Sequence, residues 1–166
     1  MTTLSLSRDI YCPCAEVFAY HTDLGRLPQH WSNVVSCRNI SCFGAPRPGD
    51  RYTWRYRMYG VDFAGYATVR EVVPQRRFVW STDGGIRAAI TAEYTALSAH
   101  RTRVALHVDY DVPGGLVGRA VDRLLVEHRN AVDGERAMDR LVERLEAEVA
   151  ARLDQGERWH SAALQR

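Results

Sequence analysis

The sequence predicts an α+β domain in which a seven-stranded antiparallel sheet is covered by one long C-terminal helix. Three observations support this fold class. Apolar and polar residues alternate between regularly spaced turn signals over residues 32–115, which is typical of strands. Apolar residues then recur every three or four positions over residues 116–153, which is typical of a helix. A chain of 166 residues, 46% of them hydrophobic, fits one domain with a sizeable core.

The first elements are a strand and two short helices. Residues 3–10 alternate in polarity and predict the first strand. Pro13 is suited to a first helical turn, so we expect a short helix over residues 13–20. A second short helix is expected over residues 23–31, with Asp23 as its cap.

Six further strands are expected after Trp31. The clearest covers Arg51 to Met58, where an aromatic face alternates with a cationic face of arginines that we expect in solvent. Two strands near residues 90–96 and 103–110 alternate in the same way. This pattern predicts an antiparallel sheet with one covered face and one wet face.

The long helix is expected from about Leu116 to Leu153, with a bend at Gly134 and a mobile polar tail over residues 154–166. Residues 1–153 would then form the single domain. The predicted inward stripe consists of Val117, Val121, Leu124, His128, Ala131, Glu135, Met138, Val142, Leu145 and Val149.

Composition and charge exclude several partners. The net charge is +2 without a basic run, so neither nucleic acid nor stable membrane insertion is expected. All 22 basic residues are arginine, which excludes lysine-based Schiff-base and P-loop chemistry. The start of the chain has no secretory pattern, which predicts a cytoplasmic protein.

Cysteine spacing predicts neither a metal site nor a disulfide framework. Cys12 and Cys14 are separated by one residue, which is too close for a usual zinc pair, and Cys37 and Cys42 add no matching motif. We expect reduced thiols, no metal and no cofactor.

Three segments give the chain a family resemblance. They are residues 48–52 (PGDRY), 77–81 (RFVWS) and 108–115 (VDYDVPGG). With the order of elements, they resemble the START/Bet v1-like (SRPBCC) superfamily, especially its polyketide cyclase/dehydrase branch. The resemblance covers about residues 3–153 and implies a helix-grip fold, in which a curved sheet wraps around the long helix and encloses a cavity for an apolar or polycyclic ligand.

The aromatic side chains on the covered faces of the strands have two interpretations. They can simply fill the core. Alternatively, they can line a pocket for a flat, partly oxygenated ligand, because buried hydroxyl and indole groups need polar partners. Trp31 would lie at the cavity mouth and either gate it or plug the small helices. The proposed ligand-binding strand residues are Tyr52, Trp54, Tyr56, Tyr94 and Tyr110.

His128 and Glu135 are polar residues on the predicted inward stripe of the helix. In one interpretation the stripe drifts and both reach solvent or make structural hydrogen bonds. In the other they line the cavity, where His128 would transfer protons near neutral pH and Glu135 would orient it or hold a ligand hydroxyl.

The sequence therefore predicts a protein that binds a hydrophobic, polycyclic or polyketide-type small molecule. The leading hypothesis is a cyclase/aromatase-like role in natural-product biosynthesis. The alternatives are non-catalytic binding, sequestration or self-resistance toward a natural product such as an enediyne, and a lipid or quinone carrier. Fold alone does not decide between them, and the oligomeric state is left open.

Overall fold

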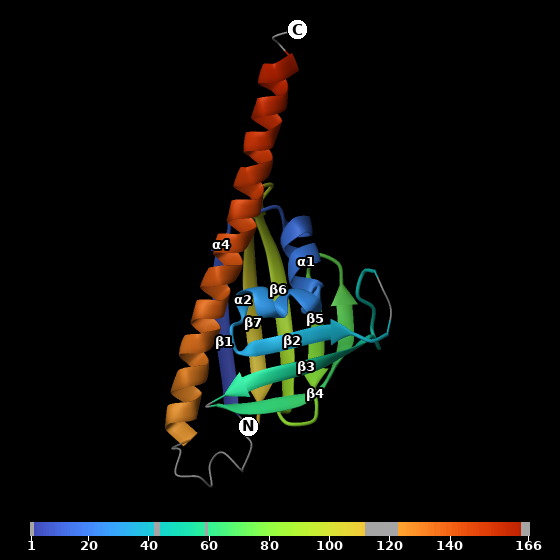
Figure 1. Ribbon diagram of the computed structural model, residues 1–166, viewed down its shortest axis with the longest axis vertical. Coiled ribbons are helices and arrows are strands. Elements are labelled where there is room, and N and C mark those ends of the chain that lie inside the picture. The colour runs from blue at the N-terminus through green and yellow to red at the C-terminus, as the bar shows by residue number, and fades with distance from the viewer. Residues whose placement is uncertain (1, 42–43, 59, 112–122, 164–166) are drawn as a thin grey trace.

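The structure, a computed structural model, describes residues 2–41, 44–58, 60–111 and 123–163, and it is built on one antiparallel sheet. The strands are β1 (Thr2–Ile10), β2 (Val34–Asn39), β3 (Arg51–Met58), β4 (Val61–Val73), β5 (Arg77–Thr82), β6 (Ala88–Ser98) and β7 (Arg101–Tyr110). Their order across the sheet is β1-β7-β6-β5-β4-β3-β2. The seven predicted strands are therefore confirmed, and the sheet curves so that β2 to β4 run across the direction of β1 and β7 (Figure 1).

Two small helical segments follow β1, as predicted. The first is α1 (Cys14–Thr22), and the second is divided into a 3-10 turn, η1 (Leu24–Arg26), and α2 (Leu27–His30). The Asp23 side chain accepts a hydrogen bond of 3.1 Å from the Gly25 amide and so caps η1. These segments lie over the sheet (Figure 1).

The long helix α4 (Arg123–Ala163) completes the helix-grip fold, in which the sheet packs against the helix. Residues 116–122 of the predicted helix lie outside the described residues. The predicted end at Leu153 is wrong, because the helix continues to Ala163 and extends past the sheet (Figure 1). No helix in the described part of the chain has the length and hydropathy needed to span a membrane.

Gly134 of α4 lies against Leu4 and Leu6 of β1, and the helix is continuous through it. A Cβ atom at this position would lie 2.9 Å from Leu6 Cδ1 and 3.1 Å from Leu4 Cδ2. The glycine therefore allows the helix to pack close to the strand.

The core lies between the covered face of the sheet and the helices. Its fully buried members include Ile10, Phe78 and Leu106 from the sheet and Leu24 and Leu141 from the helices. On β3 the aromatic side is covered and the arginine side is exposed, which confirms the two faces predicted for this strand.

Candidate functional site

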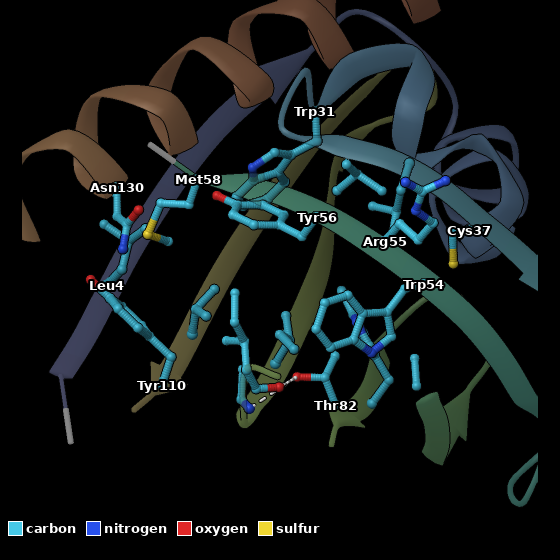
Figure 2. Close-up of a pocket in the computed structure, with 18 residues that line it drawn as sticks. Leu4, Trp31, Cys37, Trp54, Arg55, Tyr56, Met58, Thr82, Tyr110 and Asn130 are labelled. Atoms are coloured by element: carbon cyan, nitrogen blue, oxygen red, sulfur yellow. Dashed lines mark hydrogen bonds between the residues drawn. The ribbon is translucent and has the colours of Figure 1, made fainter. Parts of the chain in front are cut away.

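A partly open pocket of about 160 Å³ lies between the sheet, α2 and α4 (Figure 2). Its lining is mainly aliphatic and aromatic. The residues are Leu4, Leu27, Trp31, Val34, Cys37, Trp54, Arg55, Tyr56, Met58, Ala67, Trp80, Thr82, Ile86, Ala88, Ile90, Val108, Tyr110 and Asn130. A concave, mostly apolar space with a few polar atoms is the usual form of a small-molecule site.

Four of the predicted ligand-binding residues, Trp31, Trp54, Tyr56 and Tyr110, line this pocket. Trp54 and Tyr56 come from β3, Tyr110 comes from the end of β7, and Trp31 follows α2. Residues far apart in the sequence thus meet around one space, as Figure 2 shows.

Tyr52 and Tyr94 are buried but are not among the residues that line the pocket. The Tyr94 hydroxyl lies 2.6 Å from His21 Nδ1. Burial raises the pKa of Tyr52 to about 12 and raises that of Tyr94 well above its ordinary value. For these two residues the geometry agrees with the core-packing interpretation.

His128 and Glu135 are exposed and are not among the pocket-lining residues. Glu135 forms an ion pair with Arg8 of β1. The buried side of α4 is centred on Gly134 and Leu141, and at about 100° per residue both predicted residues lie roughly 100–120° around the helix from it. The placement therefore agrees with the drifting-stripe alternative rather than with a position in the cavity.

Asn130 and Trp80 line the pocket although neither was among the predicted site residues. Asn130 belongs to the stripe that includes Gly134 and Leu141, and this stripe could have been found by treating the glycine as a contact position. Trp80 lies two residues after Phe78 and shares the buried face of β5 with it, so strand parity was the signal for it.

Three buried polar atoms of the pocket residues have no hydrogen-bond partner among the described residues: Trp31 Nε1, Trp54 Nε1 and Asn130 Oδ1. Figure 2 shows the two indole nitrogens at separate places in the pocket. By contrast, the Thr82 hydroxyl donates to Ile86 O and accepts from the Ala88 amide, both at 3.0 Å. Unpaired buried polar atoms are costly, and a bound ligand can satisfy them.

Arg55 is among the lining residues, but its side chain belongs to the exposed arginine side of β3 and its charge is already paired. Arg55 Nη2 donates to Asp62 Oδ2 at 3.0 Å, and Arg57 donates to the same carboxylate. Hydrogen bonding from Arg57, supported by Arg55, lowers the pKa of Asp62 to about 2. The guanidinium of Arg55 therefore leaves no unpaired positive charge for a ligand.

Two titratable groups of the described lining, Cys37 and Tyr56, have pKa values that are shifted upward by burial. Burial raises the pKa of the Cys37 thiol to about 12. Burial also raises the pKa of Tyr56, whereas the hydrogen bond with the Asn33 side chain lowers it by a smaller amount. The nearby Trp31 indole also lowers the pKa of Tyr56, but Trp31 Nε1 forms no hydrogen bond with the Tyr56 hydroxyl. The described lining residues include no Asp, Glu, His or Lys.

Comparisons with known proteins agree with this architecture. A family model described as "Polyketide cyclase / dehydrase and lipid transport" matches residues 1–146. No curated protein matches the chain significantly.

Several solved structures share the fold. A Thermus thermophilus protein is 22% identical, with a TM-score of 0.70 over 89% of this chain and 99% of that one. A START superfamily protein from Mycobacterium smegmatis is 13% identical, with a TM-score of 0.72 over 87% and 97% of the two chains. The Zhui aromatase/cyclase from Streptomyces sp. R1128 is 11% identical, with a TM-score of 0.72 over 89% and 95%. At these identities the likeness concerns the fold.

Proposed function

Because the chain belongs to the polyketide cyclase/dehydrase and lipid transport family, we propose that it binds a hydrophobic, polyketide-type small molecule in the pocket between the sheet, α2 and α4. The observation that carries the proposal is the apolar, aromatic wall interrupted by the unpaired polar atoms of Trp31, Trp54 and Asn130. Apolar walls supply the affinity, and the polar atoms select a ligand that has matching groups.

The polar atoms define the complementary ligand. Each indole N–H needs an acceptor oxygen, and Asn130 Oδ1 needs a donor such as a hydroxyl. Because Arg55 is paired with Asp62, no unpaired charge of the described lining would offset a carboxylate or an ammonium group. The ligand is therefore uncharged, with carbonyl and hydroxyl groups on an apolar skeleton.

The size of the pocket sets how such a ligand fits. Its volume of about 160 Å³ is close to that of an engineered apolar cavity of about 150 Å³ that holds benzene. One aromatic ring fills the space, and the rest of a polycyclic ligand extends through its open side or displaces wall side chains.

Binding without acid–base chemistry is the role that we favour, as in sequestration or carriage of a natural product. The described lining contains no Asp, Glu, His or Lys, burial raises the pKa of the Cys37 thiol to about 12, and His128 is exposed. A cyclase/aromatase-like role is the second candidate, supported by the fold shared with the Zhui aromatase/cyclase. In that role the pocket would act by restraining a reactive chain.

Three matched probes test the proposal: anthracene, 9,10-anthraquinone and anthracene-9-carboxylate. We expect binding of the first two, tighter binding of the quinone by roughly 3- to 10-fold through its carbonyl groups, and weak binding of the carboxylate. Trp54→Phe removes one N–H and should reduce quinone affinity while leaving anthracene affinity nearly unchanged. Failure of all three to bind would overturn the proposal.

Native mass spectrometry of freshly purified protein, followed by extraction, provides an independent test. A co-purifying oxygenated polycycle would support the proposed ligand class. A co-purifying fatty acid or phospholipid would contradict it and favour a lipid carrier instead.

A further inference from the structure

Two histidines from the small helices are buried together directly behind the pocket wall. His21 of α1 and His30 of α2 are each 3% exposed, and their ring centroids are 6.0 Å apart. The His21 ring lies edge-on to Trp80 at 6.2 Å, and Trp80 lines the pocket. The pair therefore lies between the small helices and the sheet, one residue layer from the ligand space.

The environment of the pair favours neutral imidazoles. His21 faces His30 and the Tyr94 hydroxyl of β6, which lies 2.6 Å from His21 Nδ1. No described carboxylate forms a hydrogen bond or ion pair with either ring.

His30 is flanked by further groups from α1, η1 and α4. It faces the Tyr20 ring, the Arg26 backbone carbonyl, and the guanidinium groups of Arg144 and Arg140. Its Nδ1 has no partner among the described residues. Burial, followed by the proximity of His30, lowers the pKa of His21 to about 3. Burial, followed by the charge of Arg144, lowers the pKa of His30 to about 4.

We propose that His21 and His30 form an acid-sensitive contact that holds α1 and α2 on the sheet, and that acidification releases these helices and opens the pocket. The contact joins two short helices to β5 and β6, whereas the strands are joined to one another by continuous antiparallel pairing. Protonation therefore acts on the helices before it acts on the sheet.

Opening of α2 would change the pocket directly. Leu27 of α2 and Trp31, the residue after His30, both line it. Displacing the helix thus removes part of the wall together with an indole donor. The loss of ligand affinity with acid rests on the proposed function, whereas the movement of the helices does not.

Proton linkage sets the size of the effect. A histidine that titrates near 6.5 when exposed, and near 3 or 4 when buried, shifts the balance toward the open state by about 30-fold at about pH 5. Two such histidines shift it by up to about 1,000-fold, while groups exposed in both states contribute little.

Amide hydrogen exchange at about pH 7.5 and about pH 5, corrected for intrinsic exchange rates, measures this opening. We expect the protection factors of α1 and α2 to fall by at least 30-fold at the lower pH, while those of β6 and β7 fall much less. In His30→Gln, the ratio of the α1 and α2 protection factors between the two pH values should be about 30-fold smaller than in the wild-type protein. The matched control His100→Gln replaces an exposed histidine and should leave it unchanged.

Anthraquinone affinity at the two pH values gives the second readout. We expect it to fall with acid in the wild-type protein and to fall less in His30→Gln. Unchanged protection of α1 and α2 at the lower pH, or an equal loss in β6 and β7, would overturn the acid-sensitive contact. Absence of anthraquinone binding at neutral pH would instead overturn the proposed function. The hydrogen-exchange result would then still test the acid-sensitive contact on its own.

Discussion

Asn33 Nδ2 donates a hydrogen bond of 2.8 Å to Asp133 Oδ2, and this bond ties the segment between α2 and β2 to α4. The Asp133 side chain is 10% exposed and also pairs with Arg129. Asn33 Nδ2 lies 3.3 Å from the Tyr56 hydroxyl as well. Tyr56 lines the pocket, and so does Trp31, which lies two residues before Asn33. The bond between Asn33 and Asp133 therefore fixes one edge of the site.

We expect Asp133→Ala to lower the free energy of unfolding by about 1–3 kcal/mol, because it removes the nearer of the two acceptors of the partly buried Asn33 amide. Anthraquinone affinity should fall at the same time. Urea unfolding provides the measurement. Asp139→Ala is the matched control, since Asp139 lies on the same helix and pairs with Arg8 but is 56% exposed. Its effect should be about 0.5 kcal/mol or less, and equal effects of the two substitutions would contradict the assigned role of Asp133.

The two buried histidines also predict how global stability depends on pH. Burial lowers the pKa of His21 to about 3 and that of His30 to about 4, so the unfolded chain binds protons more readily than the native protein. The contribution of the two neutral histidines to the free energy of unfolding is therefore fully present above about pH 6.5, and it decreases as the pH falls toward the native pKa values. At about pH 5 the loss is about 2 kcal/mol for each histidine.

Urea unfolding of the wild-type protein and of the His21→Gln/His30→Gln double variant measures this contribution. The double variant should have a flatter profile between about pH 7 and about pH 5. Paired carboxylates are the same in both proteins, so their titration cancels in the comparison. Parallel profiles would show that the histidines are protonated without cost in the folded protein.

Gly65 of β4 is expected to tolerate no side chain. A Cβ atom there would lie 1.8 Å from the Asp83 carbonyl oxygen and 3.0 Å from Trp54 Cζ2. Because the obstacle is backbone, Gly65→Ala should cost more than about 3 kcal/mol or prevent folding. Gly60→Ala is a useful comparison, since Gly60 has a φ of 74° but no atom within 4 Å. Thermal unfolding should show a loss of only about 1 kcal/mol for it.

His128→Ala and Glu135→Ala should leave anthraquinone affinity within about twofold of the wild-type value, because both residues are exposed and outside the pocket lining. Fluorescence titration is a suitable measurement, with Trp54→Phe as the variant that lowers affinity. A large loss in His128→Ala would restore the sequence-based hypothesis that His128 acts in the cavity.

The sheet and its covered face were predictable because strand alternation is encoded residue by residue. On β3 the buried Tyr52, Trp54 and Met58 are separated by arginines and threonine, and this pattern alone identifies the face. Which aromatic residues reach the pocket was not predictable. Tyr52 and Trp54 share a face, but only Trp54 lines the space, because the curvature of the sheet and the position of α2 decide where the cavity lies.

The buried face of α4 was predicted only in part. Met138 and Leu145 of the predicted stripe are buried, whereas His128 and Glu135 are exposed. Hydrophobic periodicity detects apolar side chains, whereas Gly134, which lies against Leu4 and Leu6 of β1, has none. The apparent stripe was therefore rotated toward His128 and Glu135. The end of α4 was also misplaced, since residues 151–155 are exposed and give no periodic signal.

The pairing of β1 with β7 also determines when the binding site can form during synthesis of the chain. Thr2 pairs with Tyr110, and Ile10 pairs with Thr102, so the N-terminal strand has no sheet partner until β7 has been translated. Asn130 of α4 completes the pocket later still. Such distant contacts make folding slow, and the nascent protein gains its ligand site only after most of the chain has left the ribosome. A ligand that binds the finished pocket then stabilises only the completed fold.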